Sequence, residues 1–578
     1  MRTLGIDVGG TFTDAVLIDG GVLRTAKVPS SPRQEESVVA AAGLLRCGAV
    51  DRFAHGTTVA TNALLERKGA RTAFVTTAGF EHLLHLRRQD RAHLYRLCAD
   101  HPPSLVPLER CHGVAERMGP DGVVRALDLA SLPAFEAEAV AVCLLFSFRH
   151  PQHERAVAAE LRRRLPRARV VASCDLGPEF REYERASTTV ADAYLGPVTA
   201  RYLDALAAAA AQVGLPEPLV MTSSGGVVAL AEAAAHPARA VVSGPAAGVV
   251  GAAHLAELAG FPDAISFDMG GTSTDVCLIT GGEAGRSGDR TVGGVPIRLP
   301  TVDVHTVGAG GGSLARRDAG GALRVGPESA GAEPGPACYD RGGTEPTVTD
   351  ANLLLGRLPT RLAGGLELET DAAERALGRL DPADIVAVVN AELLRALRVV
   401  TIERGRDPRE LALVAFGGAG PLHACALAEE LEMRTVLVPR AAGVLSALGL
   451  AAGEERREHV HSYVVPLAKA GELPAAGEAD LRYRGQSFEL TIRLGGDVAA
   501  AFHRAHEKRY GYADPDRELE LVAVRTADVR PGPELVLSPG APLQVSGPTL
   551  VPLEGATCWV PEGWAGESDD HGTLVLRR

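Results

Sequence analysis

LGIDVGGTFTDAVLID, residues 4–19, and ISFDMGGTSTDVCLIT, residues 265–280, are two copies of one pattern. In each copy an apolar run ends in an aspartate, two glycines and hydroxyl-bearing residues follow, and a second apolar run begins. Two glycines between apolar runs are typical of a tight β-hairpin, because glycine adopts the positive φ angles that such turns need. One copy is an ordinary hairpin, whereas two copies in the same setting indicate a duplicated structural unit.

The turn of each predicted hairpin is suited to binding a phosphate group. Its backbone N–H groups approach an anion closely where the residues are glycines, and successive N–H groups form a concave anion site. We therefore expect phosphate contacts from Gly9, Gly10, Thr11, Thr13, Gly270, Gly271, Thr272, Ser273 and Thr274. The aspartates that end the first strands, Asp7 and Asp268, are placed to hold Mg²⁺ or to orient a nucleophile. They are the predicted catalytic and metal-binding residues.

A third glycine-rich turn, FGGAGPLHA, occupies residues 416–424. An apolar run enters it, and Pro421 is well suited to the first turn of a helix. The N–H groups and the positive end of the helix dipole there suit the phosphate or ribose side of a nucleotide. We predict that Gly417, Gly418 and Gly420 belong to the same binding site as the two hairpins.

Composition excludes several classes of protein. The 578 residues are 46% hydrophobic, enough for two to four domain cores. The net charge of −13 is spread without long blocks of one sign, which argues against nucleic-acid and anionic-membrane partners. The nine cysteines form no C-x-x-C pair, so we expect neither a disulfide framework nor a zinc cluster. No charged leader opens the chain and no uncharged run approaches the roughly 18 residues of a membrane helix. We therefore expect a cytoplasmic protein.

Strand-like and helix-like segments alternate along most of the chain, which predicts an α/β fold. We expect a first lobe over residues 1–185 and a second lobe over residues 186–455, with an Ala-rich helix from about residue 186 as the connector. Residues 456–578 change character, because two alternating strand-like runs flank a helix. They predict a smaller C-terminal α+β unit.

Two hairpin phosphate loops and a late strand–glycine–helix turn resemble the actin, sugar-kinase and Hsp70 ATPase superfamily. There ATP lies between two duplicated lobes, each of ribonuclease H-like type, which implies that each hairpin here contributes one phosphate loop. Longer segments are more specific: AHGTTVATNALLERKG, GPEFREYERASTTVADAYLGP, VDVHTVGAGGGSLA, GPACYDRGGTEPTVTDANLLLGRL and FGGAGPLHA. Together they resemble the hydantoinase A and 5-oxoprolinase family, which includes a subunit of acetone carboxylase, over residues 1 to about 455.

The resemblance implies an ATP- and Mg²⁺-dependent hydrolase that opens a cyclic amide, such as a hydantoin or 5-oxoproline, after phosphorylating the amide oxygen. It also implies a hydantoinase B-like subunit, separate or fused, and hence a hetero-oligomer. Two alternatives use the same ATP site: an ATP-dependent carboxylase subunit of acetone carboxylase type, and a non-catalytic regulatory ATPase. Family members usually carry a longer helical insertion where this chain has only residues 461–479, which leaves the choice of lactam open.

Other polar residues in these segments have two interpretations each. The first group either faces the substrate or satisfies a turn: His55, Thr57, Thr58 and Asn62. Asp303 and His305, with the glycine loop 308–312, either contact phosphate or substrate or belong to a connection of the lobe. The charged residues 181–185 form either an ion-pair network at a lobe junction or part of a substrate site.

Overall fold

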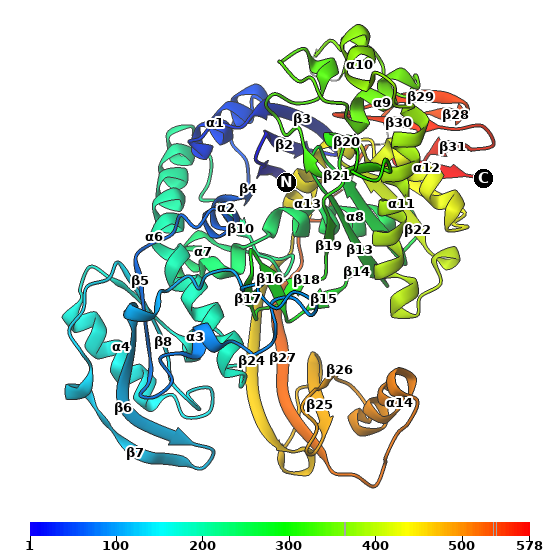
Figure 1. The fold of residues 1–578 in the computed structure, drawn as a ribbon. Helices are drawn as coiled ribbons and strands as arrows, with labels where there is room; N and C mark the ends of the chain where they lie inside the picture. Colours follow the sequence, from blue (N-terminus) through cyan, green and yellow to red (C-terminus); the bar gives the residue numbers. More distant parts are fainter. Residues whose placement is uncertain (363–365, 536, 539) are drawn as a thin grey trace.

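The computed structural model describes residues 1–362, 366–535, 537–538 and 540–578. Two lobes lie side by side in the upper part of Figure 1, and two smaller units extend below them. None of the helices in these described ranges is long and apolar enough to cross a membrane.

The two lobes are built on sheets of the same topology. In the first lobe the strand order is β3-β2-β1-β4-β10, with antiparallel pairing among β1, β2 and β3 and parallel pairing among β1, β4 and β10. These strands are β1 (Arg2–Val8), β2 (Phe12–Asp19), β3 (Val22–Pro29), β4 (Arg52–Gly56) and β10 (Leu219–Met221). In the second lobe the order β14-β13-β12-β22-β23 repeats both the sequence of strands and their directions. Its strands are β12 (Ala264–Met269), β13 (Thr274–Thr280), β14 (Glu283–Ala284), β22 (Ala412–Phe416) and β23 (Thr435–Val438).

The duplicated topology confirms the predicted fold class. Each quoted hairpin is the first hairpin of its sheet, β1–β2 in one lobe and β12–β13 in the other. Helices α1 (Gln34–Leu44) and α6 (Glu182–Gln212) pack on the first sheet, and α11 (Pro382–Val400) and α12 (Gly420–Glu430) pack on the second. The hairpins thus hold equivalent places in two α/β lobes.

A separate α/β unit is inserted into the first lobe, between β4 and α6. Its sheet has the order β7-β6-β5-β8-β9 and forms the lower left part of Figure 1. The strands are β5 (Thr72–Thr77), β6 (Cys111–Gly119), β7 (Gly122–Asp128), β8 (Ala139–Cys143) and β9 (Arg169–Ala172), covered by α4 (Gln152–Arg164). After this unit, α6 returns the chain to the first lobe, where β10 and β11 (Val227–Ala229) complete the sheet. The sheets therefore do not follow the boundary that we placed at residue 185.

The C-terminal tail is divided between the two lobes. Strands β24 (Glu455–Pro466) and β27 (Leu519–Arg530) form a long ribbon that joins the first sheet through the pairing of β24 with β11. The ribbon carries β25 (Glu478–Tyr483), β26 (Leu490–Arg493) and α14 (Val498–Tyr510) at the bottom of Figure 1. The last strands, β28 (Gln544–Ser546), β31 (Ala565–Ser568) and β32 (Leu574–Arg577), extend the second sheet instead, because β32 pairs with β23. Residues 456–578 are thus not one unit.

Two helices that lie between the lobes cross each other so closely that their backbones are in contact at glycines. They are α8 (Ser243–Leu258) and α13 (Leu445–Ala452). A Cβ atom on Gly449 would lie 1.9 Å from the carbonyl oxygen of Ala247, and one on Gly251 would lie 2.8 Å from that of Leu445. On its other side α13 touches β1, where a Cβ on Gly5 would lie 2.0 Å from the oxygen of Ala447. These glycines bring α13 against both α8 and the first sheet.

We expect Gly449→Ala to lower the melting temperature by several degrees. The added methyl group cannot fit without separating α13 from α8, and overpacking of this kind costs about 1–3 kcal/mol. Gly43→Ala in α1 is the matched control, because nothing lies within 4 Å of its added Cβ. Alanine is favoured over glycine in a helix by about 1 kcal/mol, so the control should melt at the same or a higher temperature. Equal melting temperatures for the two variants, measured by circular dichroism, would contradict the close crossing.

Candidate active site

Each of the two glycine hairpins, β1–β2 and β12–β13, carries two aspartates that face each other across its strands. Asp7 of β1 is paired with Asp14 of β2, and Asp268 of β12 is paired with Asp275 of β13. The partners of the second aspartates differ between the lobes. Lys27 of β3 forms an ion pair with Asp14, whereas the hydroxyl of Thr306 donates a 2.5 Å hydrogen bond to Asp275. The duplicated site is therefore asymmetric, with its lysine on the first lobe alone.

A glycine on the neighbouring parallel strand makes room for each leading aspartate. A Cβ on Gly56, at the end of β4, would lie 2.3 Å from Oδ1 of Asp7. A Cβ on Gly417, just after β22, would lie 2.3 Å from Oδ1 of Asp268. We predicted His55 and Thr57, the neighbours of Gly56, as candidate site residues but not the glycine itself. The signal was present, because Gly56 is the last residue of β4 and Gly417 directly follows β22, the equivalent strand of the duplicated unit.

Burial and like charge raise the pKa values of these aspartates. Burial, with a contribution from Asp14, raises the pKa of Asp7 to about 7. The pKa of Asp268 rises to about 8 through burial and then through the charges of Asp275, Asp7 and Asp14. Because the charges of Asp7 and Asp14 act on Asp268, the carboxylates of the two lobes lie within electrostatic range of one another. Lys27 lowers both pKa values, and the charge of Arg290 acts on Asp275.

The tips of the two loops are open, while their bases are closed. The N–H of Gly9 donates to Phe12 O (2.9 Å) and that of Gly270 donates to Ser273 O (3.0 Å), which closes the two hairpins in the same way. Beyond these bonds the exposed tip residues are Gly10, Thr11, Gly271 and Thr272. Ser273, half-buried, precedes the first residue of β13.

Thr13 and Thr274 are not positioned to bind a phosphate, contrary to our expectation. Both are fully buried. The hydroxyl of Thr13 is bonded to Ser30 Oγ (3.0 Å), and that of Thr274 donates to Ala309 O (2.6 Å). They lie at the first residue after each turn, where the strand pairing directs them into the lobe.

The glycine loop 308–312 supports the second phosphate loop. The N–H groups of Gly311 and Gly312 donate to the carbonyl oxygens of Gly270 (3.0 Å) and Gly271 (2.7 Å). A Cβ on Gly310 would lie 2.6 Å from the carbonyl carbon of Gly271, so the two loops are in backbone contact. Of the two interpretations, the structure shows a packing connection within the lobe.

Asp303 and His305 lie beside this loop without joining the cleft carboxylates directly. Asp303 forms an ion pair with Arg404. His305 starts β19 (His305–Val307), opposite Val276 of β13. Burial raises the pKa of Asp275, and the hydrogen bond from Thr306 and the charges of Arg290 and His305 partly oppose that rise.

His55 is a core residue, contrary to the substrate interpretation. It is fully buried, with Nδ1 3.1 Å from Ile6 O and Nε2 2.6 Å from the hydroxyl of Tyr202. Burial lowers its pKa to about 4, so it is neutral at physiological pH.

Thr57, Thr58 and Asn62 also satisfy a turn, at the start of α2 (Val59–Leu65). Thr57 donates to Gln34 Oε1 (3.2 Å), and Thr58 Oγ1 accepts from Gln34 Nε2 (3.0 Å) and from Asn62 Nδ2 (3.3 Å). Their polar groups bind one another across α1 and α2. The turn interpretation therefore describes all four residues of this group, His55 included.

The third glycine turn lies directly against the end of β12. Gly417 has a φ of +79°, and the N–H of Ala419 donates to Met269 O (2.9 Å). Gly418 is exposed, while Gly420 is buried at the start of α12. The structure thus places Gly417 and Gly418 beside Asp268 and Gly420 behind them.

Mg²⁺ fits this donor set on chemical grounds. In the described part of the chain, no group of three or more His, Cys, Asp or Glu side chains is arranged to hold a metal ion. Mg²⁺ does not need such a cage, since it commonly binds one or two carboxylates together with water and substrate phosphates. Asp7 and Asp268 are the residues that would hold it, and a divalent cation would offset the four carboxylates that otherwise repel a polyphosphate.

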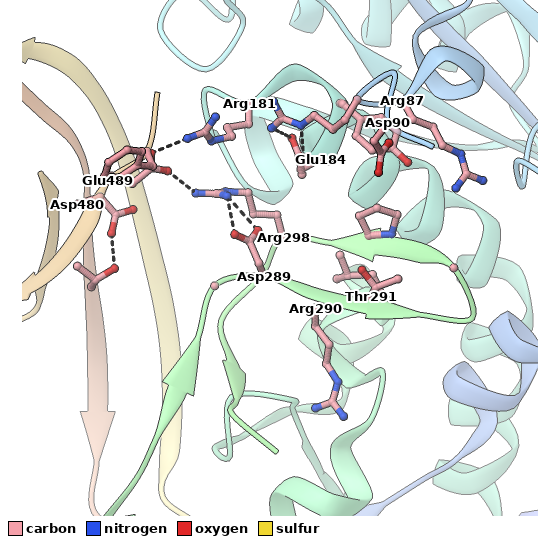
Figure 2. Close-up of a pocket in the computed structure, with 18 of the residues that line it drawn as sticks. Arg87, Asp90, Arg181, Glu184, Asp289, Arg290, Thr291, Arg298, Asp480 and Glu489 are labelled. Carbon is pink, nitrogen blue, oxygen red and sulfur yellow. Dashed lines mark hydrogen bonds and ion pairs between the residues drawn. The ribbon is translucent and has the colours of Figure 1, made fainter. Parts of the chain in front are cut away.

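A cavity of about 770 Å³ lies away from the loops, between the inserted unit, residues 288–298 and the C-terminal ribbon. Ion pairs join its walls: Arg181 to Glu489 (2.5 Å), and Arg298 to Asp289 (2.9 Å) and to Glu489 (3.5 Å). Figure 2 shows Arg298 between these two carboxylates. Glu184 accepts two 2.7 Å bonds from Arg88. Of the charged residues 181–185, Arg181 and Glu184 thus form ion pairs at this junction, as one of the two interpretations held, whereas Arg185 donates to the carbonyl oxygens of Glu179 (2.6 Å) and Leu144 (2.7 Å).

Comparisons with known proteins agree with this architecture. Residues 3–165 match the family model described as the hydantoinase/oxoprolinase N-terminal region, and residues 185–459 match the hydantoinase/oxoprolinase model. Caprolactamase subunit alpha of Pseudomonas jessenii is 34% identical over 90% of this chain and 85% of that protein. For 5-oxoprolinase 1 of Arabidopsis thaliana the identity is 32% over 93% of this chain and 50% of that protein. The acetone carboxylase beta subunit of Xanthobacter autotrophicus is 31% identical over 78% of this chain and 70% of that protein.

Two solved structures share the whole fold. The ATP-dependent caprolactamase from Pseudomonas jessenii superposes with a TM-score of 0.86 and 29% identity, covering 99% of both chains. A nucleotide-free acetone carboxylase superposes with a TM-score of 0.76 and 25% identity, covering 100% of both chains. The family models and these full-length similarities establish that the chain belongs to the hydantoinase/oxoprolinase family.

Proposed function

We propose that this protein is the ATP-hydrolysing subunit of an enzyme that opens a cyclic amide by phosphorylating the amide oxygen. One observation carries the proposal: each lobe presents a glycine hairpin with a half-buried aspartate, and the aspartates of the two hairpins lie within electrostatic range of each other. The exposed tips at Gly10, Thr11, Gly271 and Thr272 would donate to the phosphates of ATP. Asp7 and Asp268 would hold Mg²⁺, which neutralises developing phosphoryl charge when bound.

Phosphorylation gives an unreactive amide a route to hydrolysis. The bond from the γ-phosphorus to ADP breaks as a bond to the amide oxygen forms, and the product is an imidate-like electrophile. Water then adds to its carbon, the ring C–N bond breaks, and a second water releases phosphate from the acyl phosphate. The chain's own contribution is to align the phosphates between two loops and to exclude water from the transfer.

A carboxylase subunit is the second candidate. It is supported by the likeness to acetone carboxylase, in which the same phosphoryl chemistry would activate a ketone enol or bicarbonate. The overall fold is more similar to the caprolactamase, which favours the cyclic amide. Stimulation of ATP hydrolysis by a ketone only in the presence of bicarbonate would select the carboxylase instead.

A second polypeptide is part of the proposal. Several relatives are named as subunits, and no group of three or more His, Cys, Asp or Glu side chains in the described residues is arranged to hold a metal ion for the hydrolytic step. A reactive phosphorylated intermediate must pass to the second site without release, which requires a tight interface. We therefore propose a hetero-oligomer with a hydantoinase B-like subunit.

The chain alone should hydrolyse ATP slowly and open lactams inefficiently. Addition of a hydantoinase B-family subunit should couple ATP hydrolysis to lactam opening, so that the amino acid product and ADP appear in equal amounts. The measurement is the ratio of ring-opened product to ADP by chromatography. Efficient stoichiometric opening by the chain alone would show that no partner is needed.

Asp268→Asn should reduce Mg²⁺-dependent ATP turnover by at least about 100-fold, because a neutral amide cannot replace a carboxylate that holds the cation. The fold should persist, as checked by circular dichroism, since asparagine has nearly the same shape. Glu392→Gln on the exposed face of α11, where Glu392 pairs with Arg395 at 3.3 Å, is the control and should keep wild-type turnover. Wild-type turnover in folded Asp268→Asn would refute the assignment.

The same substitution should stabilise the nucleotide-free protein at alkaline pH. The pKa of Asp268 is about 8 in the folded protein, against about 4 for an ordinary aspartate. Between these values the folded protein retains a proton that the unfolded chain has released, so raising the pH lowers stability. The asparagine side chain of the variant has no proton to lose and stays neutral throughout.

The difference in melting temperature between the Asp268→Asn variant and wild type should therefore grow from pH 5 to pH 8 and level off above it. Differential scanning fluorimetry in EDTA measures this difference at each pH. Parallel pH curves for the variant and wild type would show that Asp268 is not a buried carboxyl of raised pKa.

A further inference from the structure

A second, smaller cavity of about 190 Å³ lies next to the large one. It is bounded by the turn Thr222–Ser224, the segment 175–179, residues 298–300 and the start of β24. Arg298 lines both cavities, so the two are neighbours separated in part by this side chain. None of the residues that we assign to phosphate or Mg²⁺ binding lines either cavity.

The turn at one end of this cavity lies at the same sheet edge as Asp7. Strands β1, β4 and β10 are parallel neighbours, with Asp7 level with Gly56 and Val220 level with His55. Thr222 therefore stands one residue beyond the level of Asp7, two strands away, which corresponds to about 10 Å. Ligands of open α/β sheets bind at the carboxyl ends of parallel strands. The turn that borders the cavity thus lies at the sheet edge where a phosphoryl acceptor is needed.

The charged side chains around the cavity are already matched with opposite charges. The pairs are Arg298–Glu179 (3.1 Å), Arg456–Glu454 (3.2 Å), Arg456–Glu458 (2.5 Å), Arg239–Glu232 (3.7 Å), Arg155–Asp175 (3.2 Å) and His459–Asp528 (2.9 Å). In the described lining, every arginine thus has a carboxylate partner. A ligand carboxylate would have to break one of these pairs or remain unpaired, which is costly in a buried site.

The rest of the lining suits a small neutral amide. Leu176, Pro178, Val228, Leu299 and Pro300 supply apolar surface. Thr222 donates its only hydroxyl proton to Gly226 O (2.9 Å), so the 3.0 Å contact between Thr222 and Ser224 is donated by Ser224. The Ser224 oxygen then keeps lone pairs that can accept an N–H.

We infer that this cavity binds the ring of a small, uncharged cyclic amide, with Ser224 Oγ accepting its N–H and its oxygen left free for phosphorylation. The inference rests on the proposed function and narrows its substrates to lactams and hydantoins without a carboxylate. It predicts that 2-pyrrolidinone is preferred to 5-oxoproline, which is the same ring carrying a carboxylate.

Two variants test the cavity in different ways. Gly177→Leu fills it: Gly177 is extended (φ −165°, ψ 95°), and its added Cβ would meet Leu299 at an ordinary 3.6 Å. Ser224→Ala removes the proposed acceptor with little change of volume. Ser147→Ala is the matched control, because Ser147 is equally buried, bonds Ser173 at 3.2 Å and lines neither cavity.

Binding is measured by saturation-transfer NMR with 2-pyrrolidinone, caprolactam and 5-oxoproline, and the KM for lactam by ATP turnover. We expect wild type and Ser147→Ala to bind both neutral lactams, and 5-oxoproline to bind at least about tenfold more weakly than 2-pyrrolidinone. Each cavity variant should weaken lactam binding by about tenfold or more. Ser224→Ala should raise the KM for lactam more than it changes kcat, which a general loss of structure would not do.

The cavity assignment is overturned if 5-oxoproline binds as tightly as 2-pyrrolidinone, if Gly177→Leu binds lactams like wild type, or if wild type binds neither lactam. Its failure differs from that of the proposed function. Lactam-stimulated ATP turnover with an unchanged KM in both variants would leave the function standing and remove the cavity. If wild type binds lactams, the variants abolish that binding and lactams do not stimulate ATP turnover, then the cavity assignment stands and the proposed function is wrong.

Discussion

The crossing of α8 and α13 is the constraint on which the site depends. At Gly449 and Gly251 the two helices touch through their backbones, and α13 is pressed against β1 by a third glycine, Gly5. A backbone contact has no side chain that can adapt, so it fixes the angle and spacing of the elements that it joins. Since β1 carries Asp7, and α8 leads into β12 with Asp268, the crossing sets how the two carboxylates face each other.

Bringing the four aspartates of the two hairpins near one another costs free energy, and a bound divalent cation would offset that cost. Asp7 and Asp268 keep raised pKa values because burial and like charge both disfavour their ionised forms, and Lys27 only partly opposes this effect. Evolution of stability alone would replace them with neutral residues. Their presence is understandable if a divalent cation and a polyphosphate complete the charge balance, since then each group neutralises another.

The sequence predicted the parts of the site that are encoded locally. The two hairpins and the late glycine turn were visible because turn chemistry and strand alternation are short-range signals. The burial of Thr13, Thr274 and His55 was not, because it depends on which strand face meets the core. Gly56 was overlooked for a related reason: its role follows from the parallel pairing of β4 with β1. Likewise, β10 returns to the first sheet by pairing residues 219–220 with residues 54–55. No local sequence pattern predicts a pairing between segments so far apart in the chain.

The divided tail has a consequence for the integrity of both sheets. Strand β24 covers the edge of the first sheet at β11, and β32 covers the edge of the second at β23. An uncovered edge strand offers unpaired N–H and C=O groups to other chains and invites aggregation. Between the two strands, Gly532 lies against the end of α13 and Ser538 donates to Gly21 O at 2.8 Å, so the connection is held to the body of the molecule. Loss of the tail would therefore expose an edge strand of both sheets at once, because one C-terminal segment covers the edges of both lobes.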